Sequence, residues 1–159
     1  MTDDEFLREL ESCSLAESDF GHVAHVRAAY LYLRASDFPA ALARMRDAIR
    51  NFAAHMGKPE RYHETVTVAY LALIGQCLRE RGDNGGWPAF AQRNPELFEP
   101  DLLQRYYSRA QLDSEAARRM FVLPDPSNPR RGRRRNQTGR AAVAAATQRH
   151  SSLVGSSKP

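Results

Sequence analysis

The sequence of 159 residues contains only two cysteines, Cys13 and Cys77. They are too few and too far apart for a disulfide framework or a cysteine metal knuckle, so each is expected to behave as a small apolar residue. The chain also lacks an apolar run near the ~18 residues that span a bilayer. Its acidic start, MTDDEFLREL, has neither the basic region nor the apolar block of a secretory signal. We therefore expect a cytoplasmic protein without a membrane span.

Several catalytic motifs are missing as well. The loop GDNGG is not followed by a helix that starts with Lys-Ser or Lys-Thr, which excludes a P-loop. No nucleophile elbow is present, and Thr67 stands where the zinc-protease motif His-Glu-x-x-His would need its second histidine. The paired Glu-x-x-His motifs of di-iron bundles are absent too. No reaction class is selected by a motif.

Acidic residues are absent from the C-terminal part of the chain. Residues 126–159 contain eight of the 23 basic residues and none of the 19 acidic ones, which gives this segment a net charge of +8 and leaves residues 1–125 at −4. The segment has almost no large apolar side chain, so it cannot bury enough surface to offset the entropy of ordering. We predict that residues 126–159 form a basic, disordered tail.

The remaining 125 residues show helical periodicity. Thr2 and Glu5 form a capping-box pattern, Asp37 with Pro39 is typical of a helix start, and Gly57 is typical of a helix end. The run AAYLYL is apolar on all sides, which indicates a central helix. The prediction is one all-α domain over residues 1–125, a compact bundle of five to seven helices.

A fourth helix is expected to begin near Pro59 and to end near Gly82. The letters TVTV alternate like a strand, but an apolar stripe at helical spacing continues for three turns, and a single strand would have no partner. In this register His63 faces inward with the stripe, whereas Glu64 is turned aside by about a third of a turn. The arginines of the preceding helix, Arg46 and Arg50 among them, are expected mainly on its wet side.

Three blocks resemble a family of small, all-helical, uncharacterised bacterial proteins. The blocks are FGHVAHVRAAYLYLR, IRNFAAHMGKPERYHETVTVAYL and YYSRAQLDSEAARRMFVLPD, which lie between residues 20 and 125 with gaps between them. The family lends no activity, and the basic tail is not part of its pattern. The resemblance implies a set of positions that matter: His22, His25, Arg27, Tyr62, His63, Thr65 and Ser108.

The histidines are the main candidates for chemistry, and three interpretations remain open. His22, His25 and His63 could form a zinc or iron site from two packed helices. They could instead be neutral and hydrogen-bonded within the bundle. A third interpretation is a metal-free pocket for a small polar or anionic ligand, with His63 and Arg27 as donors, which becomes an acid–base enzyme if Glu64 is the base and His63 the acid.

The sequence therefore predicts a binding or accessory module with a polar His/Tyr/Arg cluster between its second and fourth helices. The expected ligand-binding residues are His22, His25, Arg27, Tyr62, His63 and Thr65. A small metal-dependent or acid–base enzyme that uses His22, His25, His63 and Glu64 is the first alternative, and a protein partner is also open. The second alternative is a nucleic-acid accessory protein, because the run NPRRGRRRNQTGR could contact phosphates, although it has no aromatic residue to stack on bases.

Overall fold

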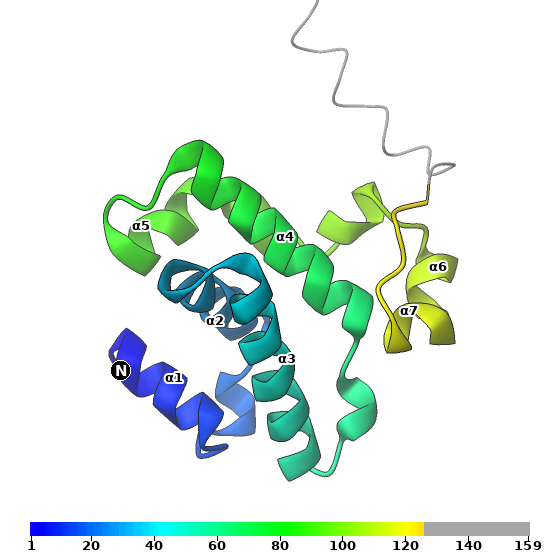
Figure 1. Ribbon diagram of the computed structural model, residues 1–159, viewed down its shortest axis with the longest axis horizontal. Coiled ribbons are helices and arrows are strands. Elements are labelled where there is room, and N and C mark those ends of the chain that lie inside the picture. The colour runs from blue at the N-terminus through cyan, green and yellow to red at the C-terminus, as the bar shows by residue number, and fades with distance from the viewer. Residues whose placement is uncertain (126–159) are drawn as a thin grey trace, which may run out of the picture.

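The computed structural model describes residues 1–125, and these form an all-α fold (Figure 1). The α-helices are α1 (Asp3–Glu11), α2 (His22–Ala35), α3 (Phe38–His55), α4 (Glu64–Arg81), α5 (Gly86–Arg93), α6 (Arg109–Asp113) and α7 (Glu115–Arg119). Short 3-10 helices connect them: η1 (Glu17–Asp19), η2 (Pro59–Arg61), η3 (Pro95–Phe98) and η4 (Leu102–Arg105). Over the described residues this confirms the all-α prediction and the expected number of helices. The basic segment 126–159, with its predicted disorder and its possible nucleic-acid contacts, lies outside the described residues.

Two helices begin where local side chains predict. The backbone N–H of Glu5 donates to the Thr2 hydroxyl over 3.2 Å, and the Thr2 N–H donates to the Glu5 carboxylate over 2.7 Å, which completes the capping box of α1. Asp37 caps α3 by accepting from the N–H of Ala40 over 3.0 Å. Both signals are local, because each links residues only three apart, and both predictions are confirmed.

The start of α4 differs from the prediction. Pro59 belongs to the separate 3-10 helix η2, and α4 begins only at Glu64. His63 is the N-cap residue with an extended backbone, and its Nδ1 accepts from the N–H of Val66 over 3.3 Å. At the other end, Gly82 has a φ of +69°, a left-handed conformation that favours glycine at a helix end. His63 therefore does not share the helical register from which the sequence placed it.

Helix α2 is the centre of the bundle, as its apolar run predicts. It packs against α3 on one side and α4 on the other (Figure 1), and the rings of Tyr30 and Tyr32 are fully buried. Their hydroxyls still find partners, because Tyr30 donates to Asp83 and Tyr32 donates to Glu11. Burial, reinforced by the bond to Asp83, raises the pKa of Tyr30 to about 12.

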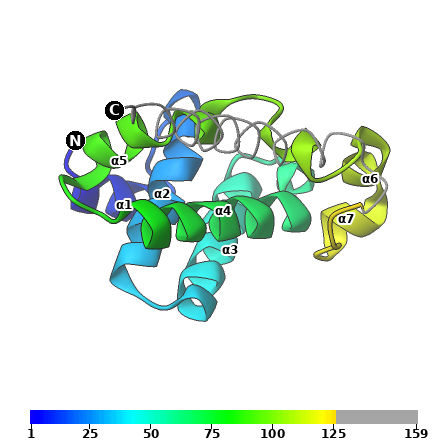
Figure 2. The same ribbon diagram turned by 90° about the horizontal axis from the view of Figure 1, so that it is seen from above.

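The smaller helices lie at the two ends of α4. Figures 1 and 2 show α5 beside one end and α6 with α7 beside the other. After α7 the chain runs as an extended segment, residues 120–125, which returns to the start of α4. None of the helices described here combines the length and the apolar character needed to cross a membrane.

Candidate functional site

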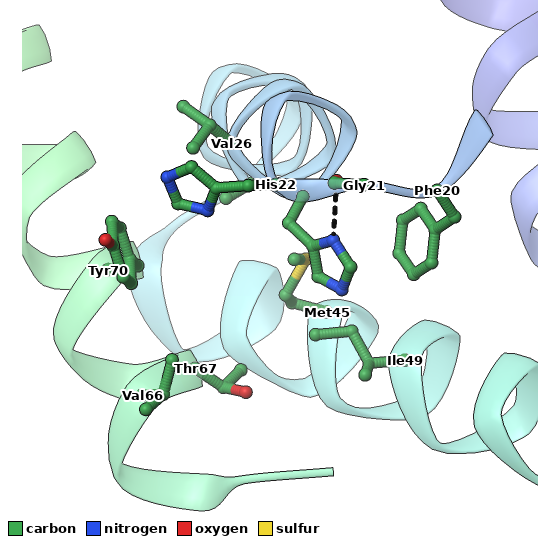
Figure 3. Close-up of a pocket in the computed structure, with 11 residues that line it drawn as sticks. Phe20, Gly21, His22, Val26, Met45, Ile49, Val66, Thr67 and Tyr70 are labelled. Atoms are coloured by element: carbon green, nitrogen blue, oxygen red, sulfur yellow. Dashed lines mark hydrogen bonds between the residues drawn. The ribbon is translucent and has the colours of Figure 1, made fainter. Parts of the chain in front are cut away.

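The residues that the sequence grouped into one polar cluster fall into separate places in the structure. Arg27 faces α1, Glu64 and Tyr62 face α3, and His63 and Thr65 face the C-terminal helices and segment. Only His22 and His25 border a cavity between α2, α3 and α4 (Figure 3). The expected shared cluster between α2 and α4 does not form. Its residues instead make three separate groups, and the remaining two histidines border the cavity.

Arg27 connects α2 to α1. Its Nε donates to the Asp3 carboxylate over 2.9 Å, and its guanidinium lies 4.7 Å from the centre of the Phe6 ring. Two of the three guanidinium nitrogens, Nε and Nη2, thus bond to Asp3. Arg27 does not line the cavity between α2, α3 and α4, so the structure does not place it where a ligand bound by His25 would meet it.

His63 is occupied at both ring nitrogens. Because Nδ1 accepts from the N–H of Val66, the proton of the neutral ring is on Nε2, which donates to the carbonyl of Leu112 over 2.9 Å. The ring thus caps α4 and holds α6 against it. Neither nitrogen is left for a metal ion or for proton transfer to a ligand in this arrangement.

Thr65 attaches the extended segment after α7 to α4. Its hydroxyl donates to the carbonyl of Met120 over 2.8 Å and accepts from the N–H of Val122 over 3.1 Å. The hydroxyl is fully used, and Thr65 is itself fully buried. Ser108 is the N-cap of α6 and accepts from the N–H of Gln111. Thr65 and Ser108, two of the positions that the family resemblance marks, are thus bonded to backbone groups.

Glu64 is buried, with 6% of its side chain exposed, and not turned aside as the helical register suggested. It bonds to Arg46, accepts from the Tyr62 hydroxyl over 2.6 Å and lies 3.5 Å from Arg50. Burial by itself would raise the pKa of the Glu64 carboxyl, but the bonds from Arg46 and Tyr62 outweigh it and the pKa is lowered. An ionised carboxylate with this many donors is a poor general base, so Glu64 fits a link between α3 and α4.

His22 and His25 lie on adjacent turns of α2, but their rings have different partners. His22 donates from Nε2 to the carbonyl of Leu97 over 2.9 Å, and its ring meets the edge of Tyr70 with centroids 5.0 Å apart. A shared metal site would require free nitrogens of both rings to approach one point. Instead, Leu97 in η3 takes the Nε2 of His22, while His25 bonds to Gly21.

His25 keeps one ring nitrogen for the cavity. Nδ1 bonds to the carbonyl of Gly21 over 2.8 Å, and because a carbonyl only accepts, the proton of the neutral ring lies on Nδ1. Nε2 then carries a lone pair, and no residue among 1–125 bonds to it. Burial lowers the pKa of His25, partly opposed by the Gly21 carbonyl. The ring also stacks on Phe20 with centroids 3.9 Å apart, which fixes its orientation.

The cavity beside His25, which we call the inner cavity, has a volume of about 330 Å³. It lies among α2, α3 and α4, and most of its wall is apolar. Its lining residues are Phe20, Gly21, His22, His25, Val26, Ala29, Met45, Ile49, Val66, Thr67 and Tyr70. Figure 3 shows Met45 and Ile49 on one side of it and Tyr70 on the other.

A second cavity adjoins the inner one. This outer cavity has a volume of about 500 Å³ and shares Phe20, Gly21, His25 and Ile49 with it. The outer cavity reaches η1 and η2, where it is lined by Glu17, Lys58 and Arg61. The two cavities thus form one site that is apolar inside and charged toward η2.

No metal centre forms among the described residues. Within residues 1–125 no group of three or more His, Cys, Asp or Glu side chains is placed to hold a metal ion. His22, His25 and His63 have separate backbone partners, at Leu97, Gly21 and Leu112. The structure therefore does not bring together the three histidines that were the candidate zinc or iron ligands.

The sequence did not reveal most of the residues that make the cavity. Met45 and Ile49 lie four residues apart on α3, as residues of one helical face do, and periodicity cannot distinguish a side chain that fills the core from one that borders a cavity. Lys58 and Arg61 flank Pro59 in a stretch that was assigned to a helix. The one usable signal was the pair of histidines at the start of α2, of which His25 borders both cavities.

Comparisons of the chain with protein-family models, with curated proteins and with solved structures give no match. The family resemblance of the three sequence blocks therefore stays a prediction. The functional argument depends on the geometry of the cavity and on the groups that line it.

Proposed function

We propose that this protein is a cytoplasmic binding module that takes a small, largely apolar ligand into the inner cavity and hydrogen-bonds it at His25. The observation that carries the proposal is a half-buried histidine that borders an apolar cavity and has one ring nitrogen without a partner among residues 1–125. A cavity with an apolar wall and a few polar groups is the usual form of a small-molecule site.

The size of the cavity supports a small ligand. Ligand sites commonly have volumes of ~300 to 1,000 Å³, and the inner cavity, at about 330 Å³, is at the lower end of that range. The inner cavity is partly open to solvent, because the exposed residues Gly21 and His22 line it together with the buried Val26 and Ala29, so a ligand can enter it from outside.

The state of His25 sets what the ligand must offer. With its proton on Nδ1 and its pKa lowered by burial, the ring is neutral near pH 7 and presents an acceptor at Nε2. A ligand with one O–H or N–H group on an apolar body meets both the acceptor and the apolar wall. Selectivity for such a donor follows, because a ligand without one would cover Nε2 and leave it without a partner, which costs ~1–3 kcal/mol.

Binding of phenylnaphthylamine tests the proposal. This neutral probe has an apolar body and one N–H donor, and its fluorescence rises when it leaves water. We expect saturable binding to the full chain. His25→Leu should weaken binding by roughly threefold to tenfold, the value of one neutral hydrogen bond, whereas His25→Gln, which keeps an acceptor, should weaken it less.

Blocking the cavity supplies the decisive control. Ile49→Trp, and separately Val66→Phe from the opposite wall, should abolish binding, while Ala43→Trp on the exposed face of α3 should not change it. Each variant must keep the helical circular dichroism of the wild type. No saturable binding, or binding that both blocking variants retain, would refute the proposed function.

A further inference from the structure

The outer cavity carries a charge arrangement that the apolar inner cavity does not use. Lys58 Nζ and Arg61 Nη1 both donate to one oxygen, Oε1 of Glu17, over 2.6 Å and 2.9 Å. Two cations thus share one carboxylate, so the charged residues that line this cavity sum to +1. Lys58 and Arg61 are 37% and 63% exposed at their side chains, so both remain reachable from solvent.

The position of this charge relative to His25 determines how a ligand is oriented in the site. His25 borders both cavities and presents the lone pair of Nε2, which repels an anion. The anionic end of a ligand is therefore disfavoured beside His25 and favoured at the other end of the outer cavity, beside Lys58 and Arg61. Between these ends Phe20, Ile49 and Met56 form an apolar wall.

We propose that the site binds an amphipathic anion, whose apolar body occupies the inner cavity and whose carboxylate, or a comparable anionic group, lies beside Lys58 and Arg61. This inference rests on the proposed function, because the apolar body lies in the inner cavity, where a donor on that body, if the ligand carries one, bonds to His25. Glu17 then acts as an internal counterion: it holds Lys58 and Arg61 at the outer cavity while no ligand is bound. A ligand carboxylate either joins Glu17 on the two cations or replaces it, with two charge-assisted hydrogen bonds in either case.

Displacement of phenylnaphthylamine by decanoate, decanol and decylamine tests the inference on the full chain. The three compounds have the same chain length and differ in the charge of the head group, and displacement of the probe reports only on the cavity. At about pH 8, where a carboxyl group is ionised, decanoate should displace the probe at about one fifth of the decanol concentration. Added salt should reduce this preference, because both cations are exposed.

Variants of the outer cavity distinguish the cations from general charge. The double variant Lys58→Gln, Arg61→Gln should bring decanoate to the level of decanol, whereas Arg118→Gln, an exposed arginine of α7, should not. Glu17→Gln keeps both cations and removes their competitor, so it should tighten decanoate binding by about threefold. That increase does not depend on whether the double variant folds.

Each outcome decides a separate question. Equal displacement by decanoate and decanol overturns the anionic ligand and leaves the proposed function in place. Preferred displacement by decylamine also overturns it and assigns the recognising charge to Glu17. Failure of phenylnaphthylamine to bind at all is the failure of the proposed function itself, which the first experiment measures without any anion.

Discussion

The buried carboxylate of Glu64 gives the most direct test of how α3 and α4 are held together. Glu64→Gln keeps the shape of the side chain and removes its charge. It leaves an amide beside Arg46 and Arg50, while the bond from the Tyr62 hydroxyl can still form to the amide oxygen. The variant therefore isolates the ionic part of the contact.

The structure sets the size of the effect. A hydrogen bond to a charged group contributes ~1.5–3 kcal/mol, and loss of one partner of a fully buried pair costs ~3–5 kcal/mol. The side chains of Arg46 and Arg50 are 35% and 53% exposed, so water compensates part of the loss. We expect Glu64→Gln to lower the free energy of unfolding by about 2–3 kcal/mol.

Urea unfolding followed by far-ultraviolet circular dichroism measures this change, with Glu60→Gln as the matched control. Glu60 is exposed and no bond involves its side chain within residues 1–125, so its variant should keep the wild-type midpoint.

The direction in which the contribution of Glu64 to stability changes with pH also follows from its pKa. Because the pKa of Glu64 is lowered from its ordinary 4.5, its contribution is complete above pH 4.5 and is lost as pH falls through the lowered value.

The difference between wild type and Glu64→Gln should therefore shrink in acid. A cost below ~0.5 kcal/mol, the size of an ordinary surface substitution, would refute the link between α3 and α4. A difference that shows no decrease at any pH below 4.5 at which the wild type stays folded would refute its ionic origin, because a protonated Glu64 no longer attracts Arg46 as a charge.

Three further predictions concern the other groups. Burial lowers the pKa of His25 from 6.5, so the contribution of the neutral ring to stability is complete above pH 6.5 and is lost as pH falls below it. The free energy of unfolding of His25→Gln should therefore depend less on pH between about 4 and 7 than that of the wild type. Thr65→Val removes the hydroxyl that bonds to two backbone groups, and we expect a loss of ~1–3 kcal/mol together with faster amide exchange at Val122; unchanged exchange would contradict this tether. For metal content, elemental analysis of chelator-free protein should give the same zinc and iron for wild type and His63→Ala, because both nitrogens of His63 are occupied; a stoichiometric metal that His63→Ala removes would restore the metal site.

The local signals in the sequence predicted the fold well. The caps at Thr2 and Asp37 involve residues three apart. The run AAYLYL of α2 is apolar on all sides, so its burial can be predicted without knowing how the surrounding helices are arranged. By contrast, the start of α4 depends on tertiary contacts, because the cap at His63 is completed by a bond to Leu112 from a distant part of the chain. A periodic pattern extends such a helix backward to Pro59 and includes His63, which lies outside it. Glu64 is inside the helix, but the buried face of α4 runs through Glu64, Val68 and Leu71, which the sequence did not identify.

The candidate site was harder to predict for a related reason. Arg46 and Arg50 were expected on the wet side of α3, and partly exposed side chains can still reach a buried acid on the next helix. The sequence gives no indication that Glu64 has such partners, so it could not show that this acid is buried. His22 and His25 were correctly found at adjacent turns, but only the position of η3 decides that His22 bonds to Leu97 while His25 keeps a ring nitrogen for the cavity.

The first turns of α4 connect the proposed ligand site to the C-terminal part of the described chain. Val66 and Thr67 line the inner cavity, while the neighbouring Thr65 and His63 hold the extended segment and α6. Consecutive residues of a helix point in different directions, about 100° apart, so one turn can contact a ligand on one side and the C-terminal segment on the other. A ligand large enough to push Val66 would therefore act on the same backbone that anchors Met120 and Val122.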